Sequence, residues 1–300
     1  MRVFIGGASG FLGTALARQL CAAGHTPVAL VRRSPRGSDE VQWDPEQALD
    51  PAKLADCDAI VNLSGKNIAA RWTPQVKREI AESRKNATLT LAVAAAESYL
   101  QTGKPKAMVS ASGVGYYGDR GDELIAEDHS PGIGFLADVC RHWEAANMPA
   151  VDAGVRVVCL RIGVVLARHG GALKSMLPPF RLGVGGKVGS GRQYWSWIAL
   201  EDVIGAMMFA LENERLNGPV NMVAPNPVTN EDFVRALGSV LHRPAVFPLP
   251  AFAVKLMLGE MGEELLLTSA RAVPNSLRAA GYVFRYTDVE TALRAALESK

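Results

Sequence analysis

Near the N-terminus, three glycines are spaced so that their backbone could bind a cofactor. Gly7, Gly10 and Gly13 recur at every third position, directly after the apolar run at residues 3–5. The run predicts a buried strand, and residues 14–23 predict a helix with leucines on one face. A glycine-rich turn between them lets a diphosphate approach the backbone, and its oxygens then meet the free N–H groups at the helix start. The pattern predicts a dinucleotide site, although the same glycines could form an ordinary loop.

We expect the whole turn to contribute to this site. Gly7 can adopt a conformation that a side chain would forbid, Gly10 lets the diphosphate approach, and Gly13 lets the helix pack against the strand. The residues expected to contact the cofactor here are Gly7, Ala8, Ser9, Gly10, Phe11, Leu12 and Gly13.

The end of the second predicted strand indicates which dinucleotide binds. Folds of this kind that prefer NAD carry Asp or Glu there, which holds the ribose 2′-hydroxyl. This chain has Arg32 and Arg33 instead, and the next acid is Asp39. Guanidinium groups suit a phosphate ester, so we expect NADP(H), that is NADP or NADPH, as the cofactor. The alternative is that both arginines merely end an edge strand in solvent, which leaves the missing acid unexplained.

Strands and helices must position these groups, and they alternate through the first two thirds of the chain. Further strands are predicted at residues 27–31, 59–63, 106–110 and 155–162, and helices at 73–99 and 135–147. Thr73 is expected to cap the long helix, with Pro74 in its first turn. This alternation predicts an α/β fold: a doubly wound parallel sheet of the Rossmann type, with helices on both faces.

The pattern changes near Ala167, where Gly and Pro become frequent. We expect a dinucleotide-binding Rossmann domain over residues 1–165, to which a strand and a helix at about 198–225 return. Residues 166–197 and 226–300 would form a smaller, mostly helical C-terminal lobe over the carboxyl ends of the strands, where ligands bind in such folds. Helices of this lobe are expected at residues 230–241, 251–269 and 288–298.

Composition argues against several other classes of protein. The net charge of +2, without a block of like charge, argues against nucleic acid or an anionic membrane as a partner. No apolar run approaches the roughly 20 residues that span a bilayer, and glycines interrupt the N-terminal apolar run as they would not in a signal peptide. Histidines and cysteines lack metal-ligand spacing, so no metal is expected. The four cysteines form no CxxC pair, which favours a reduced, cytoplasmic setting.

Several longer stretches follow the pattern of a known family. These stretches are residues 62–68, 71–73, 79 with 83–84, 110–118, 135–140 with 143–144, 248–250, 259–261 and 264–266. Together they resemble the extended short-chain dehydrogenase/reductase family, and within it an atypical branch called epimerase family proteins, which are NAD(P)-dependent epimerase/dehydratase-like. The resemblance covers essentially the whole chain. It implies a Rossmann domain with a small C-terminal substrate lobe.

The resemblance implies cofactor contacts beyond the glycine turn and the two arginines, at Leu63, Ser64, Glu79 and Arg84. Leu63 and Ser64 would end the third strand beside the adenosine. Arg84 would reach a phosphate or an adenine-side acceptor from the long helix. Glu79 would accept a hydrogen bond from a ribose hydroxyl or orient Arg84. For these two charged residues the alternative is a solvated helix face.

Catalysis is where the chain departs from the family that it resembles. Extended members use a Ser or Thr with a Tyr-x-x-x-Lys pair, in which the tyrosine exchanges a proton with the substrate and the lysine lowers the tyrosine pKa. None of the six tyrosines here is followed four residues later by Lys. The tyrosine position falls within residues 135–137, which carry no hydroxyl, and the lysine position falls near Cys140.

Other side chains could replace the missing pair. Ser112, Tyr116 and Tyr117 follow the fourth predicted strand, at the end of the sheet where ligands bind. We expect Ser112 to hold a substrate oxygen and one of the tyrosines to supply the proton. The alternative is that both tyrosines pack beside the nicotinamide without doing chemistry. Arg161 and Ile162 end the fifth strand and are also expected to lie beside the cofactor.

These features predict an NADP(H)-binding protein of the epimerase/dehydratase type that acts as an oxidoreductase or epimerase on a small polar substrate. The alternative is a non-catalytic NADP(H)-binding sensor or regulatory protein, which the missing Tyr-x-x-x-Lys pair favours. The sequence leaves open the substrate, the direction of reaction and whether the protein forms a homo-oligomer.

Overall fold

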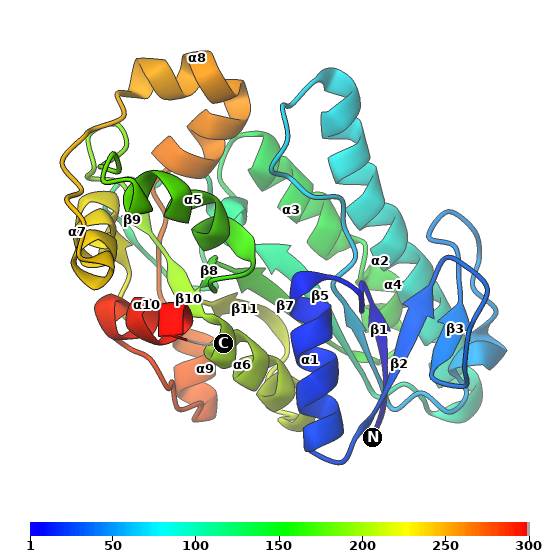
Figure 1. Cartoon of the computed structure of the whole chain (residues 1–300). Coiled ribbons are helices and arrows are strands. Elements are labelled where there is room, and N and C mark those ends of the chain that lie inside the picture. The colour runs from blue at the N-terminus through cyan, green and yellow to red at the C-terminus, as the bar shows by residue number, and fades with distance from the viewer. Residues whose placement is uncertain (299–300) are drawn as a thin grey trace.

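The computed structural model describes residues 1–298 and contains one large parallel sheet. Its seven strands lie in the order β11-β7-β5-β4-β1-β2-β3, and every neighbouring pair is parallel. The strands are β1 (Arg2–Gly6), β2 (Thr26–Val31), β3 (Glu40–Gln42), β4 (Ala59–Asn62), β5 (Ala107–Gly113), β7 (Arg156–Ile162) and β11 (Gly218–Met222). The predicted α/β fold with a doubly wound parallel sheet is confirmed (Figure 1).

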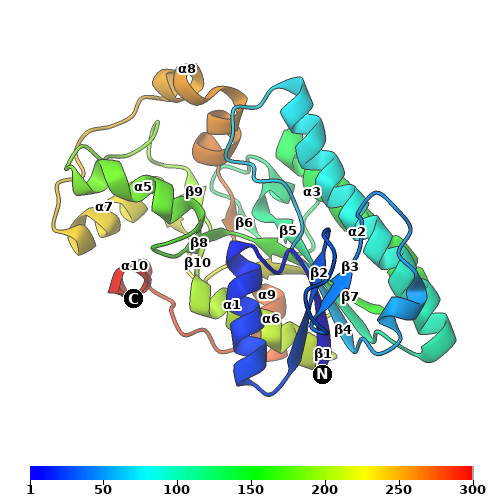
Figure 2. The ribbon, with the colours of Figure 1, turned by 45° about the vertical axis from the view of Figure 1, so that its right-hand side comes forward.

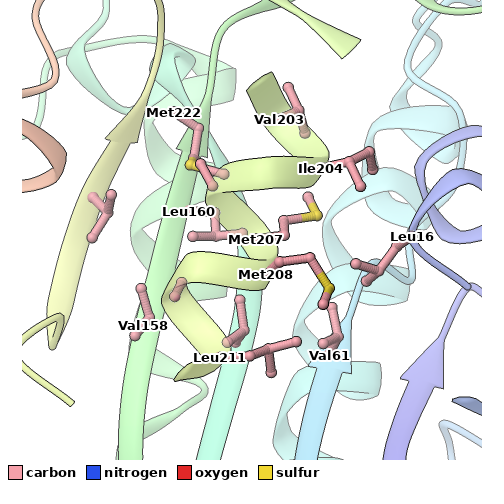
Figure 3. Packing of buried hydrophobic residues seen from close by; sticks show 14 of the residues in the cluster. Leu16, Val61, Val158, Leu160, Val203, Ile204, Met207, Met208, Leu211 and Met222 are labelled. Atoms are coloured by element: carbon pink, nitrogen blue, oxygen red, sulfur yellow. The ribbon is translucent and has the colours of Figure 1, made fainter. Parts of the chain in front are cut away.

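Helices cover both faces of the sheet because side chains alternate along each strand. Ile5 of β1 lies in one buried cluster with Leu16, whereas its neighbour Phe4 lies in another with Leu91. Figure 3 shows the first cluster, where Met207 and Met208 lie among side chains from β4 and β7. The flanking helices are α1 (Phe11–Ala22) and α6 (Leu200–Glu212) on the first face, and α2 (Pro74–Thr102) and α4 (Met148–Asp152) on the second.

The long helix α2 begins where its sequence signals predict. The side chain of Thr73 accepts a hydrogen bond from the backbone N–H of Val76 at 3.2 Å, and Pro74 is the first helical residue. Gly103 follows the last turn in the left-handed conformation, with a φ of 73°, which glycine adopts without strain. Local capping therefore sets both ends of this helix.

The remaining elements lie mainly beside the carboxyl ends of the strands (Figure 2). β8 pairs with β10, β9 with β12 and β6 with β13, and a third buried cluster joins α5, α7 and α10. Their bounds are β6 (Leu124–Ile125), β8 (Val164–Leu166), β9 (Tyr194–Trp195), β10 (Trp197–Ala199), β12 (Val228–Thr229), β13 (Arg271–Ala272), α3 (Phe135–Ala145), α5 (Gly171–Arg181), α7 (Asn230–Leu241), α8 (Ala251–Gly262), α9 (Asn275–Ala280), α10 (Val289–Glu298), and the short helical segments η1 (Pro51–Leu54), η2 (Val114–Tyr117) and η3 (Glu263–Leu267).

One predicted helix is interrupted. The sequence predicts a single helix over residues 251–269, but α8 ends at Gly262, η3 follows it, and Thr268 is extended. Gly259 lies inside α8 with a φ of 61° and a ψ of −146°, which is not a helical conformation. A Cβ built on Gly262 would lie 2.6 Å from the Cβ of Leu258. Gly259 therefore kinks the segment, whereas Gly262 keeps a helical conformation and leaves room for Leu258.

Residues 1–298 were expected to contain neither a membrane-spanning helix nor a metal site. No helix in this range has both the length and the apolar composition needed to cross a membrane. The same range holds no group of three or more His, Cys, Asp or Glu side chains placed to hold a metal ion. Cys21 is exposed, and Cys57, Cys140 and Cys159 are buried free thiols.

Candidate functional site

The glycine turn between β1 and α1 is packed so closely that it excludes side chains. Gly7 has a positive φ of 80°, and a Cβ built on it would lie 2.8 Å from the backbone oxygen of Leu63. A Cβ on Gly13 would lie 2.3 Å from the backbone oxygen of Gly7. Real Cβ atoms do not approach other atoms so closely, so both positions require glycine. The turn therefore lies directly against the end of β4, as a Rossmann-type turn does.

The start of α1 leaves backbone donors available beside this turn. Gly10 is the N-cap residue in an extended conformation, and no side chain caps the helix. The first N–H groups of a helix have no partner within it, and the helix dipole adds a partial positive charge there. The N–H groups of Phe11, Leu12 and Gly13, next to the exposed Ser9, can therefore bind an anionic diphosphate.

The two arginines at the end of β2 have different surroundings. The sequence predicts no acid at this point, but β3 pairs with β2 and brings Glu40 there. The guanidinium of Arg33 donates to both carboxylate oxygens of Glu40, at 2.6 and 2.7 Å, and lowers the pKa of Glu40 to about 2. Arg32 is exposed and has no ion pair or hydrogen bond through its side chain within residues 1–298. Arg32 is therefore the cation that is open to a phosphate.

The end of β4 lies beside the glycine turn, so two parts of the predicted cofactor site come together. The N–H of Leu63 donates to the backbone oxygen of Gly6 at 2.8 Å. The N–H of Ser64 donates to the side-chain oxygen of Asn62 at 3.1 Å. Asn62 is fully buried, and its amide donates to the hydroxyl of Thr88 on α2 at 2.8 Å. These bonds hold Leu63 and Ser64 against the turn.

Glu79 lies near the start of α2 and pairs with a residue of the loop after β4. Its carboxylate contacts the ammonium group of Lys66, which lowers the pKa of Glu79. It also accepts a hydrogen bond from Gln75 at 3.0 Å. The Glu79 carboxylate is therefore bound by Lys66 and Gln75 and not by Arg84, and its expected contact with a ribose hydroxyl stays a prediction.

Arg84 is a half-buried cation without an acidic partner within residues 1–298. Its guanidinium donates to the backbone oxygen of Ile80 at 3.0 Å and lies 5.0 Å from the ring centroid of Trp143. A Cβ on Gly65 would lie 3.1 Å from the Arg84 Cζ. Burial lowers the pKa of Arg84. A desolvated cation with unused donors at the end of β4 can bind a phosphate or hydroxyl group.

A buried ion pair lies where β5 and β7 end. The side chain of Arg161 is 3% exposed, and it donates to both carboxylate oxygens of Glu144 at 2.9 and 2.8 Å. Ser112 donates its hydroxyl proton to the same carboxylate at 2.7 Å, and an ionised carboxylate can only accept. Glu144 therefore holds both the Arg161 guanidinium and the Ser112 hydroxyl in this structure, and their expected contacts with the cofactor and the substrate stay predictions. Ile162 is partly buried and packs against the first core cluster.

The two tyrosines of η2 differ in their freedom to act. Tyr117 is fully buried; its hydroxyl donates to Asn221 at 2.7 Å and accepts from Arg161 at 2.9 Å. Burial raises the pKa of Tyr117 to about 12. This burial makes Tyr117 a poor proton donor to a substrate, so of the two tyrosines Tyr116 is better placed for the predicted role. Tyr116 is half buried, and its hydroxyl has no partner within residues 1–298.

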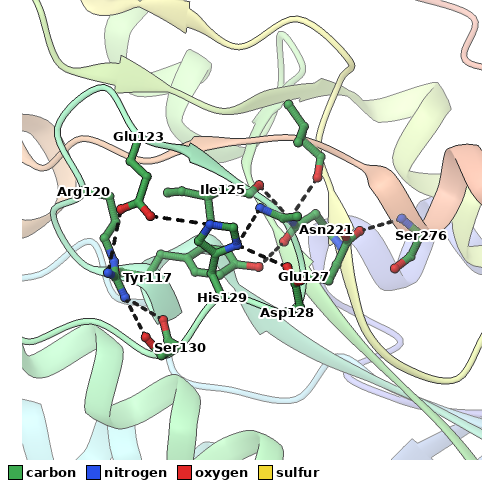
Figure 4. Close-up of polar contacts among 12 residues, drawn as sticks. Tyr117, Arg120, Glu123, Ile125, Glu127, Asp128, His129, Ser130, Asn221 and Ser276 are labelled. Carbon is green, nitrogen blue, oxygen red and sulfur yellow. Dashed lines mark hydrogen bonds and ion pairs between the residues drawn. The ribbon is translucent and has the colours of Figure 1, made fainter.

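The acids that hold this network in place were missed by the sequence reasoning. Besides Glu144, the buried Glu127 accepts hydrogen bonds from the backbone N–H groups of Asn221 at 3.1 Å and Ser276 at 3.0 Å (Figure 4). Nothing in the local sequence separates Glu127 from a surface acid. The signal for Glu144 was its place beside Trp143 in a stretch that carries the family resemblance.

Helix α3 carries apolar residues at the positions where the Tyr-x-x-x-Lys pair was sought. A Cβ on Gly115 would lie 3.1 Å from the Cβ of Leu136, and a Cβ on Gly113 would lie 3.8 Å from the sulfur of Cys140. Burial raises the pKa of the Cys140 thiol to about 11. In the folded protein these two side chains therefore lie against β5 and η2, where they offer neither a phenol nor an ammonium group.

Comparison with known proteins identifies relatives over almost the whole chain. Residues 3–223 match the NAD dependent epimerase/dehydratase family, and residues 249–296 match a domain of unknown function, DUF1731. An epimerase family protein of Mycobacterium bovis is 45% identical over 97% of this chain and 96% of its own length. The human epimerase family protein SDR39U1 is 40% identical over 98% of this chain and 99% of its own length.

Two solved structures are similar over almost all of this chain. A crystal structure of human SDR39U1 with NADPH has a TM-score of 0.89 and 36% identity, and it covers 100% of both chains. A crystal structure from Corynebacterium glutamicum, described as a nucleoside-diphosphate sugar epimerase, has a TM-score of 0.79 and 38% identity. The match covers 99% of this chain and 58% of that one.

Proposed function

This chain belongs to the NAD dependent epimerase/dehydratase family, and from that premise we propose that it binds NADP(H) at the glycine turn. The observation that carries the proposal is the turn itself, where Gly7 and Gly13 leave no room for side chains beside the uncapped N-terminus of α1. The NADPH in the crystal structure of human SDR39U1 supports the choice of cofactor.

The cofactor would be held by groups from four elements of the fold. The first N–H groups of α1 would bind the diphosphate, and the open side chain of Arg32 would bind the ribose 2′-phosphate. Leu63 and Ser64, which lie against the turn, would border the adenosine. Arg84 would donate to a phosphate or hydroxyl group from α2, because its charge has no acidic partner nearby within the described residues.

We further propose that the protein is an oxidoreductase or epimerase that acts on a small polar substrate. Bound NADP(H) would supply or accept the hydride. Tyr116 is the group best suited to exchange a proton with the substrate, because Tyr117 is buried and the hydroxyl proton of Ser112 is hydrogen-bonded to Glu144. The Arg161 guanidinium lies 3.5 Å from the centroid of the Tyr116 ring and would hold that ring in place by a cation–π contact. Ser112 keeps lone pairs with which it could accept a hydrogen bond from a substrate hydroxyl.

The second candidate is a non-catalytic NADP(H)-binding sensor. The observation that favours it is the pair Leu136 and Cys140, which lie against η2 and β5 where a phenol and an ammonium group would be needed. In that case Tyr116 would only border the nicotinamide.

Direct titration followed by a turnover assay separates these candidates. The purified protein is titrated with NADPH and NADP, and oxidation of NADPH is then followed at 340 nm with panels of carbonyl compounds, sugar nucleotides and quinones. Turnover that is lost in Tyr116→Phe and kept in Tyr117→Phe supports the enzyme. Tight binding with no turnover across the panels supports the sensor, and no binding of either nucleotide refutes both.

A further inference from the structure

A carboxylate from the C-terminal region caps the helix that borders the proposed site. Both oxygens of Glu264, in η3, accept hydrogen bonds from backbone N–H groups at the start of α3. The N–H of Phe135 lies 2.7 Å from one oxygen, and the N–H of Leu136 lies 2.8 Å from the other. A carboxylate is the best partner for such amides, since it is charged and the helix dipole favours an anion there. The contact joins segments that are 128 residues apart at Leu136.

The chain before α3 is shaped to admit this carboxylate. Gly134 has a φ of 124°, a conformation that residues with side chains rarely adopt. A Cβ built on Gly134 would lie 3.0 Å from one carboxylate oxygen of Glu264. The α3 N-cap itself offers no side-chain hydrogen bond, so Glu264 supplies the cap from outside the helix.

A second contact holds the same segment against α2. Glu260 of α8 forms an ion pair with Lys77 of α2 at 2.7 Å. The ammonium group of Lys77 also lies 4.5 Å from the ring centroid of Phe135, and the ring of Trp72 packs edge-on against Phe135 at 4.9 Å. The first turns of α2 and α3 are therefore both tied to residues 251–267.

The segment that makes these contacts has the features of a movable cover. Gly259 breaks α8 in a conformation with a positive φ. Phe252, Leu256 and Met257 are 72%, 84% and 71% exposed, and Val254 and Gly262 are the buried residues of α8. Segments with so little buried surface open more easily than the core. In Figures 1 and 2 the orange segment lies at the top of the molecule, beside the start of α3.

The two helices that this segment contacts also carry or adjoin residues of the proposed site. Leu136, whose N–H is capped, packs on Gly115 next to Tyr116. Two turns further along α3, Glu144 holds Ser112. The helix that carries Lys77 also carries Glu79 and Arg84.

We propose that residues 251–267 form a lid over the cofactor and substrate cleft, and that the Glu264 carboxylate on the α3 amides is the latch that keeps it closed. The ion pair between Glu260 and Lys77 is a second, weaker fastening. The lid's position over a cofactor rests on the proposed function, whereas the latch itself does not. Opening would break the two bonds from Glu264 and free the start of α3.

The latch is tested by hydrogen exchange of the full-length, cofactor-free protein, followed by mass spectrometry. Glu264→Ala and Gly134→Ala should each speed exchange at the start of α3 and across 251–267 by about 10-fold or more, as expected for losing charge-assisted hydrogen bonds. The matched control is Glu263→Gln, because Glu263 pairs with Lys255 inside the same segment. Exchange within two-fold of wild type in both latch variants, or an equal increase in the control, overturns the latch.

The lid is tested by the rate at which NADPH leaves, measured by stopped-flow fluorescence. Glu264→Ala should release NADPH about 10-fold faster than wild type, and Glu263→Gln should release it at the wild-type rate. Unchanged release in Glu264→Ala, with normal binding in wild type, overturns the lid. If wild-type protein binds no NADPH, the proposed function fails, and the exchange experiment alone decides whether Glu264 latches the segment.

Discussion

The difference between Arg32 and Arg33 gives the sharpest test of cofactor choice. Arg32 is exposed, with no side-chain partner within residues 1–298, so its guanidinium is available to a 2′-phosphate. A hydrogen bond to a charged group contributes roughly 1.5–3 kcal/mol. At 1.36 kcal/mol for each factor of ten, Arg32→Ala should raise the Kd of NADPH by about 10- to 150-fold. NADH lacks the phosphate, so its Kd should change little.

Arg33→Ala should act differently because of Glu40. The guanidinium of Arg33 now holds both oxygens of that carboxylate, at 2.6 and 2.7 Å. Its removal frees an acid at the end of β2, which would repel a phosphate and accept a hydrogen bond from the 2′-hydroxyl of NADH. The variant should therefore bind NADPH more weakly and NADH more tightly than wild type.

Both variants are measured by fluorescence titration with NADPH and NADH at one fixed ionic strength, since salt screens exposed charges. Arg36→Ala is the matched control, because it removes a nearby positive charge while the backbone N–H that contacts Glu40 remains. If Arg32→Ala weakens the binding of NADPH and of NADH by the same factor, the 2′-phosphate role is refuted. An effect of Arg36→Ala as large as that of Arg32→Ala would reduce that role to general electrostatic attraction.

Four further predictions concern folding, activity, cofactor binding and pH. Tyr117→Phe should lower the free energy of unfolding by about 1–3 kcal/mol in urea titrations, because buried partners lose a hydrogen bond, whereas Tyr116→Phe should leave it unchanged and lower any turnover rate by roughly 10²–10⁴-fold. Gly13→Ala should abolish NADPH binding in the same titrations, because its Cβ would lie 2.3 Å from a backbone oxygen. Glu40 has a pKa of about 2 instead of 4.5, so its stabilising contribution is full above pH 4.5 and is lost as the pH falls toward 2. Urea midpoints of Glu40→Gln should therefore fall less steeply over this range than those of wild type.

Features that depend on neighbours along the chain could be predicted from the sequence. The strand before Gly7, the helix after Gly13 and the cap at Thr73 each follow from residues within about four positions of one another. The prediction of one helix over residues 251–269 was wrong. It relied on the apolar composition of this segment and ignored Gly259, whose positive φ interrupts the helix.

Features that depend on distant segments could not be predicted. A sequence presents Tyr116 and Tyr117 as equivalent, yet only Tyr117 meets Asn221, which is 104 positions away. In the same way, the sequence does not reveal that Arg161 is buried against Glu144, or that a later strand brings Glu40 to Arg33.

The amino-acid sequence by itself determined the sheet, the glycine turn and the kind of cofactor to expect, because backbone conformation and apolar alternation are local properties. Only the tertiary structure decided which polar groups remain free to react. A polar side chain is available to a ligand when no other part of the protein already forms a hydrogen bond or ion pair with it. Glu144 accepts a hydrogen bond from Ser112, and Arg161 donates one to Tyr117. Within the described residues, the hydroxyl of Tyr116 has no such partner.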